Sequence, residues 1–256
     1  MAYRNILVER DGTTALVTLN RPERRNALSL DMLQELTFAF RALGPDARVA
    51  VLRGSGAAFS AGHDIAEMRA KDPAFYRQLF DACTTLMETL QDLAQPVIAQ
   101  VHGIATAAGC QLAASCDIVV AAQEARFATP GVRIGLFCST PMVALSRAVG
   151  SKRAMEMLLT GDAISAQEAL QAGLVNRVVP AAELAETVRG LAAKIAASSA
   201  SVVALGKRAF WRQLQMPQPL AYDYVQDVMS QNAASADAQE GMSAFLEKRP
   251  PAWSAK

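Results

Sequence analysis

The chain has 256 residues, of which 52% are hydrophobic, and its 25 basic residues nearly balance 24 acidic ones. This apolar content is enough for one large domain, with or without a small appendage, and it excludes global disorder. A formal net charge of +1 argues against a nucleic-acid binder with a broad basic face, so no nucleic-acid partner is expected.

The spacing of the cysteines and the first twelve residues indicate whether a metal site and a targeting segment are expected. Cys83, Cys110, Cys116 and Cys138 form no CxxC pair, so reduced buried thiols and no metal site are expected. Residues 1–12, MAYRNILVERDG, contain neither an apolar signal core nor an Arg/Ser-rich presequence, which predicts a cytoplasmic protein. Charge, Gly or Pro soon interrupts every apolar run, so no membrane partner is expected.

The first half of the chain alternates between strand and helix patterns. Strands are predicted over 3–9 and 13–20, with a hairpin turn at Asp11-Gly12. Ser29 is the expected N-cap of an amphipathic helix that runs to residue 44. The same patterns then predict a strand at 48–54, a helix at 73–94, a strand at 96–103, a helix at 108–116 and a strand at 117–122.

The second half is mostly helical. Helices are predicted over 141–148, 151–159 and 165–172, followed by a strand at 174–179. Beyond Pro180 the pattern is helical to about residue 247, with a break near 216–219. Alternating strands and helices followed by helices alone indicate the α/β class with a helical C-terminal part.

Three loop segments at strand ends are the candidate sites, since α/β folds place their sites there. They are AAFSAGHDIAEM (57–68), ATAAGCQLAASCD (105–117) and FATPGVRIGLFCSTP (127–141). Ala61-Gly62 permits a sharp turn, and small residues at 105–109 permit close approach of a ligand to the backbone. Free N–H groups at the helix starts that follow would donate hydrogen bonds to an oxyanion or a phosphate.

These segments resemble the crotonase (enoyl-CoA hydratase/isomerase) superfamily, and most of all one mitochondrial subgroup of it. The resemblance also includes LNRPERRNALS (19–29), MLLTGDAISAQEALQAGLVNRVV (157–179) and EGMSAFLEKRPPAW (240–253). It implies a crotonase-like spiral of ββα units over residues 1–195 and a helical region over 196–256 that forms trimers, often paired into hexamers. The implied partners are an acyl-CoA thioester and further copies of the chain. No cofactor is implied beyond the coenzyme A of the substrate.

The resemblance also implies site residues. Two backbone N–H groups form the family's oxyanion hole, and the matching positions are His63 and Ala108. Such donors stabilise the charge of a thioester enolate whatever side chain they carry. The implied substrate-binding residues are Arg24, Ala27, Leu28, Ala61, His63, Asp64, Ile65, Ala66, Ala108, Arg133, Phe245 and Lys248. Of these, Arg24 and Lys248, together with Arg25, are cations for the CoA phosphates.

The sequence departs from the family pattern at the two catalytic glutamates of the hydratases. The matching positions are Gln111 and Gly131. An amide holds a water or substrate by hydrogen bonds but does not take its proton, and glycine offers only backbone. Because each positioned acid–base group contributes about 10²–10⁴ in rate, ordinary hydration should be crippled.

Other residues near the site have competing interpretations. His63, Glu67 and Arg133 are candidates to replace the lost groups, with Arg133 as a clamp for a carboxylate on the acyl group. Asp64 is expected to cap a helix, and His102 to be structural. Cys110 and Cys138 lie near the site, but the sequence shows no base to activate them as nucleophiles.

Three functions remain open at this stage. The first is an acyl-CoA lyase or isomerase that proceeds through a thioester enolate. A decarboxylase-like lyase is the second, because the SAGHD segment is similar to that of methylmalonyl-CoA decarboxylase, although Phe137 or Cys138 lies where that enzyme has a tyrosine. The third is an acyl-CoA-binding protein without significant turnover.

Overall fold

The computed structural model describes residues 3–254, and a six-stranded sheet lies at its centre in the order β1-β2-β3-β4-β6-β9. Asp11 still pairs with Thr14, so the hairpin turn consists of Gly12 and Thr13, one residue later than predicted. All pairs after the first are parallel. The strands are β1 (Ile6–Asp11), β2 (Thr14–Leu19), β3 (Val49–Gly54), β4 (Val97–Val101), β6 (Ile118–Ala122) and β9 (Arg177–Val179).

A second, three-stranded sheet consists of β5 (Ile104–Thr106), β7 (Arg126–Ala128) and β8 (Ile164–Ser165), in the order β5-β7-β8. The sequence patterns predicted none of these strands. Strands of two or three residues show no periodicity of two by themselves; the equally short β9 was predicted only because it ends the longer run LVNRVV (174–179). The pairing of β5 with β7 brings the segments that begin at residues 104 and 126 side by side.

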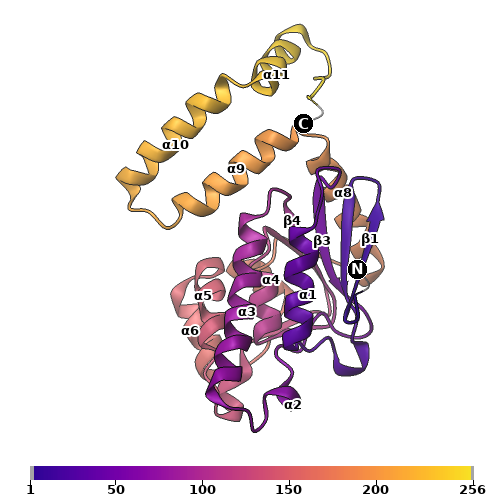
Figure 1. Ribbon diagram of the computed structural model, residues 1–256, viewed down its shortest axis with the longest axis vertical. Helices are drawn as coiled ribbons and strands as arrows, with labels where there is room; N and C mark the ends of the chain where they lie inside the picture. Colours follow the sequence, from indigo (N-terminus) through magenta and orange to yellow (C-terminus); the bar gives the residue numbers. More distant parts are fainter. Residues whose placement is uncertain (1–2, 255–256) are drawn as a thin grey trace.

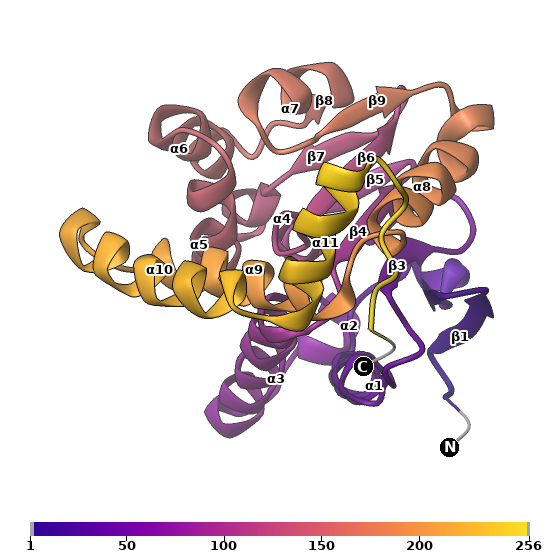
Figure 2. The ribbon, with the colours of Figure 1, turned by 90° about the horizontal axis from the view of Figure 1, so that it is seen from above.

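Helices cover both faces of the large sheet (Figures 1 and 2). Ala50 and Leu52 of β3 face the larger hydrophobic cluster beneath α1 (Leu30–Arg41), α3 (Pro73–Asp92) and α4 (Ala108–Ala114). Val49 and Val51 point to the opposite face, where α8 (Ala181–Ala196) packs. This alternation along one strand produces two apolar layers.

Shorter elements connect these layers. They are the 3₁₀ turns η1 (Pro22–Arg24) and η2 (Pro130–Ile134) and the helices α2 (Ile65–Met68), α5 (Ser139–Ala148), α6 (Ser151–Thr160) and α7 (Ala166–Ala172). The predicted cap of α1 is confirmed, because the Ser29 side chain accepts from the Met32 N–H. At α7, Ser165 and Glu168 form a complete capping box.

The last three helices, α9 (Ala200–Gln213), α10 (Gln218–Ala233) and α11 (Ala236–Glu247), form a C-terminal arm that extends from one end of the core (Figure 1). A buried lysine anchors it: Lys207 Nζ donates to the carbonyls of Leu90 and Gln95 and lies 2.7 Å from the Asp117 carboxylate. Trp211 Nε1 donates to the other oxygen of Asp117 at 2.9 Å.

The α/β class with a helical C-terminal region is therefore confirmed, while a division at residues 195/196 stays a prediction. Within residues 3–254, no single helix is long and apolar enough to cross a membrane; α8 and α9 reach that composition only together, as a pair bent by 104°.

Candidate functional site

Parts of all three predicted loop segments line one cavity of about 420 Å³. The first segment supplies its turn and α2, the second the end of β5 and the start of α4, and the third η2 and the start of α5. Phe80 of α3 closes one wall. The lining residues are Ala61, His63, Ile65, Met68, Phe80, Thr106, Ala107, Ala108, Pro130, Gly131, Arg133, Ile134, Leu136, Phe137, Cys138, Ser139, Thr140 and Pro141.

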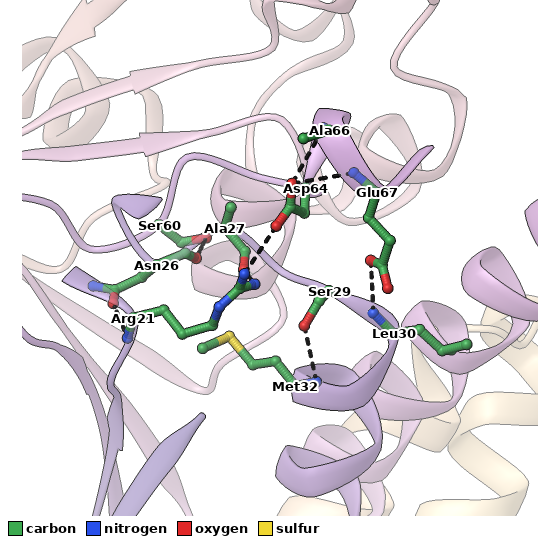
Figure 3. Close-up of polar contacts among 10 residues, drawn as sticks. All are labelled: Arg21, Asn26, Ala27, Ser29, Leu30, Met32, Ser60, Asp64, Ala66 and Glu67. Atoms are coloured by element: carbon green, nitrogen blue, oxygen red, sulfur yellow. Dashed lines mark hydrogen bonds and ion pairs between the residues drawn. The ribbon is translucent and has the colours of Figure 1, made fainter. Parts of the chain in front are cut away.

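A network of polar contacts fixes the first segment (Figure 3). Asp64 caps α2 as predicted, accepting from the Ala66 and Glu67 N–H groups at 3.2 and 3.3 Å. Its other oxygen pairs with Arg21 Nη2 at 3.0 Å. The Glu67 carboxylate accepts from the Leu30 N–H at 3.1 Å and does not line the cavity. Both acids therefore hold the loop in place, and neither lines the cavity.

The N–H of His63 has no hydrogen-bond acceptor among residues 3–254. Leu28 donates to the Gly62 carbonyl at 2.7 Å and accepts from the Asp64 N–H at 3.2 Å. Leu28 thus bonds to the residues on either side of His63, as in a parallel bridge. The N–H of His63 itself therefore points away from Leu28. Gly62 has φ +85°, which favours glycine at this turn.

The second predicted donor, Ala108, is the first residue of α4, and within the described part of the chain its N–H also lacks an acceptor. Ala107 before it has φ 49° and ψ −119°, a strained conformation for a residue with a Cβ. A Cβ built on Gly62 would lie 3.2 Å from the Ala108 nitrogen, so the two segments are in close contact. Two free N–H groups thus border the same cavity, which suits an oxyanion.

His63 is half-buried at the cavity, and its ring is neutral at pH 7. Both ring nitrogens are closed off from solvent, and neither makes a hydrogen bond of ordinary geometry within residues 3–254. The ring packs edge-on against Phe80, with centroids 5.4 Å apart. Burial lowers the pKa of His63 to about 4, against a smaller opposing effect of the Leu28 backbone. In this arrangement the His63 side chain contributes to packing against Phe80. Only a rotation of the ring would present a nitrogen to a ligand.

Of the two positions that match the family glutamates, only one lines the cavity. Gly131 lines the cavity, but Gln111 does not: it is buried in α4, where its Oε1 lies 3.8 Å from the Cys83 thiol of α3. A Cβ on Gly131 would lie 2.4 Å from the Leu136 carbonyl and 2.8 Å from Cys138 Sγ. The third segment is therefore folded around a residue without a side chain.

Arg133 lines the cavity, but its guanidinium is directed elsewhere. It pairs with the Asp162 carboxylate, and its Nε donates to the Thr160 carbonyl at 3.2 Å. Thr160 is the last residue of α6, so the cation lies at the negative end of a helix dipole.

Of the remaining predicted substrate-binding residues, this single chain brings Ala61 and Ile65 to the cavity but not Arg24, Ala27, Leu28 or Ala66. Phe245 and Lys248, at the end of α11, are also absent from its lining. The arm and α2 lie at opposite ends of the molecule (Figure 1). No residue of the arm reaches the cavity within one chain.

His102 lies outside the cavity, with Nε2 2.8 Å from the Gly56 carbonyl, as expected of a structural residue. The four cysteines are free and buried, as predicted. Burial raises the pKa of Cys110 to about 12 and raises that of Cys138 as well, so both remain thiols at neutral pH.

Sequence reasoning missed several lining residues, notably Phe80, Thr106 and Leu136. The apolar pattern of residues 73–94 assigns Phe80 to a helix face, but only packing shows that this face reaches the cavity. Thr106 donates through Oγ1 to the Ala61 carbonyl at 3.0 Å and thereby ties the first two segments together.

Comparisons with known families, sequences and structures give consistent matches. The sequence profile of the enoyl-CoA hydratase/isomerase family matches residues 9–256. The mitochondrial enoyl-CoA hydratase domain-containing protein 3 of Xenopus laevis is 49% identical over 93% of this chain and 82% of its own length. The crystal structure of its human counterpart aligns with a TM-score of 0.95 at 46% identity, covering 98% of this chain and all of that one. An enoyl-CoA hydratase of Mycobacterium smegmatis aligns with a TM-score of 0.96 at 49% identity, covering 98% and 99%.

The resemblance seen in the sequence is thus confirmed, down to the subgroup. The predicted cytoplasmic location is contradicted, because five relatives at 46–49% identity are all named mitochondrial. The prediction depended on residues 1–12, whereas the Xenopus protein extends beyond the part that this chain matches. We therefore withdraw it.

Proposed function

Since this chain belongs to the enoyl-CoA hydratase/isomerase family, we propose that it binds an acyl-CoA thioester with the carbonyl oxygen between the N–H groups of His63 and Ala108. One observation carries the proposal: two backbone donors that have no acceptor within residues 3–254 border one apolar cavity. In such a site they stabilise the charge that develops on the thioester oxygen when an enolate forms. The strained Ala107 supports the same assignment, because strain of this kind clusters at functional sites.

The reaction proposed is an isomerase or lyase step through this enolate, without efficient hydration. Among the described residues, no Asp, Glu, Lys or Tyr lines the cavity. Water addition requires a group that takes a proton from water and returns one to carbon. Gln111 is buried beside Cys83, and Gly131 has no side chain to offer.

The second candidate is an acyl-CoA-binding protein without turnover. The observation that favours it is the state of two titratable side chains that line the cavity, Cys138 and His63. The Cys138 thiol has a raised pKa, and the His63 nitrogens are closed off by packing. Binding then depends on the cavity and the backbone donors, which need no proton transfer.

The first experiment measures crotonyl-CoA hydration by the purified protein, in parallel with binding of the same thioester. Tight binding with hydration far below that of the two-glutamate hydratases is expected. Absence of CoA-thioester binding would remove both candidates. A hydration rate like that of those enzymes would show that the replaced glutamates are no handicap.

The oxyanion hole itself is tested with Gly62→Ala. The new Cβ would lie 2.9 Å from the Ala107 Cβ and 3.2 Å from the Ala108 nitrogen, which displaces the donors. Gly12→Ala is the matched control, because Gly12 also has a positive φ (+57°) but has no atom within 4 Å of its Cβ position. For any acyl-CoA that is turned over, Gly62→Ala should cost about 10²–10³ in kcat. Equal rates in the two variants would argue against the hole.

The proposed assembly is a homotrimer or a dimer of trimers. The arm exposes large apolar side chains, including Met229 at 66%, Phe245 at 82% and Leu246 at 79%. Exposed apolar surface of this kind marks an interaction site. Native mass spectrometry tests the proposal directly, and a monomer would contradict it.

A further inference from the structure

The cavity wall is apolar where an acyl chain would lie. Ile65 and Met68 of α2, Phe80 of α3, and Ile134 and Leu136 of the third segment supply large hydrophobic side chains. Burying an alkyl chain against such a wall is favourable in proportion to the area removed from water. A carboxylate in the same place loses its hydration, and a buried charge of this kind requires a partner of opposite charge in return.

Two lining residues, His63 and Arg133, have side chains able to carry a positive charge. His63 cannot supply that cation at neutral pH, because burial lowers its pKa to about 4. Its ring nitrogens are also closed off, so the neutral ring offers no hydrogen bond to a ligand in this arrangement.

The guanidinium of Arg133 is held at the end of α6. The Asp162 carboxylate pairs with Nη2, and the Thr160 carbonyl accepts from Nε. Gly161 lies between these partners with φ +65°, and a Cβ there would lie 3.2 Å from Arg133 Nε, so the turn closes against the side chain. An exposed ion pair is weak alone, but here it acts together with a C-terminal carbonyl and the helix dipole.

We propose that the cavity accepts an uncharged, apolar acyl group and disfavours acyl groups that end in a carboxylate, and that Asp162 sets this preference by holding Arg133 away. The inference deepens the proposed function and depends on it. It separates the alternatives left open by the sequence, because a decarboxylase requires a carboxylate on the acyl group. It also makes Arg133, which lies in η2, a partner of the C-terminal end of α6, whereas the sequence had left a carboxylate clamp open.

The test compares two thioesters of equal chain length that differ at the far end, hexanoyl-CoA and adipoyl-CoA. Their dissociation constants are measured by calorimetry at pH 7.5 with free CoA as the reference. The wild type should bind hexanoyl-CoA at least tenfold more tightly than adipoyl-CoA. Asp162→Asn frees the Arg133 guanidinium and should reduce the ratio of the two dissociation constants severalfold. The double variant Asp162→Asn/Arg133→Leu should return this ratio to the wild-type value.

Glu156→Gln is the matched control, because it removes one carboxylate charge from α6, the helix that Asp162 follows, at a residue that pairs with Arg153 instead. A general electrostatic effect on the CoA phosphates would change both affinities equally in both variants, so the ratio is the informative quantity. Adipoyl-CoA binding as tight as hexanoyl-CoA, or an Asp162→Asn ratio equal to that of the wild type, would overturn the inference. If neither thioester binds better than free CoA, the proposed function fails and the inference with it.

Discussion

His63 makes the stability of the fold depend on pH in a predictable window. In the folded chain burial lowers its pKa from 6.5 to about 4, so the unfolded chain takes up a proton as pH falls below about 6.5 while the folded chain does not. Stability is therefore fully present above pH 6.5 and is lost as pH falls toward 4. Between pH 7.5 and 5.0 the loss from this one group is about 2 kcal/mol, at about 1.4 kcal/mol per pH unit.

The change that tests this is His63→Leu, which fits an apolar environment and removes the titrating ring. Urea unfolding of both proteins at pH 7.5 and 5.0, at one protein concentration, gives four free energies of unfolding. The wild type should lose about 2 kcal/mol more than the variant between the two pH values. Both proteins share the carboxylates with lowered pKa, such as Glu168 and Glu240 at about 2. The contribution of these carboxylates to the pH dependence of stability therefore cancels in the difference between the two proteins.

At pH 7.5 the variant should be at least as stable as the wild type, because it no longer buries two nitrogens that lack hydrogen bonds. His102→Asn is the control for removing a histidine as such, since His63 is intact in it, and it should keep the wild-type pH dependence. If wild type and His63→Leu lose the same free energy, the buried neutral imidazole described here is incorrect.

Three further variants test how the chain is built around the site and the arm. Gly131→Ala should lower the free energy of unfolding by about 1–3 kcal/mol in urea, because its Cβ would lie 2.4 Å from the Leu136 carbonyl. Ala107→Gly should raise it by up to about 1 kcal/mol, since the relief of strain at φ 49° exceeds the added entropy of glycine in the unfolded chain. Lys207→Met should cost about 3–5 kcal/mol and speed hydrogen exchange in residues 200–213, because it leaves the Asp117 carboxylate without its buried partner. Unchanged exchange in the arm would mean that other contacts hold it.

The sequence by itself determined the large elements and the family. Apolar periodicity located most strands of the large sheet and most long helices, because most of them bury a regularly spaced face; β1 buries only Ile6 and α10 buries no residue in the single chain. The caps at Ser29 and Asp64 were predictable, since a side-chain oxygen at a helix start satisfies N–H groups only a few residues away. Gln111 and Gly131 could likewise be recognised as departures, because their chemistry depends on residue type alone.

Only the tertiary structure decided how the candidate residues face one another. Gln111 is turned toward Cys83, Arg133 is held by α6, and the His63 ring is closed off against Phe80. Each of these contacts joins residues from separate elements, and packing rather than local spacing selects the side-chain direction. The three-stranded sheet escaped prediction because its strands have at most three residues and, unlike the equally short β9, belong to no longer predicted run. The polarity of the cavity, and with it the acyl group proposed, is a property of side chains that meet only in the folded chain.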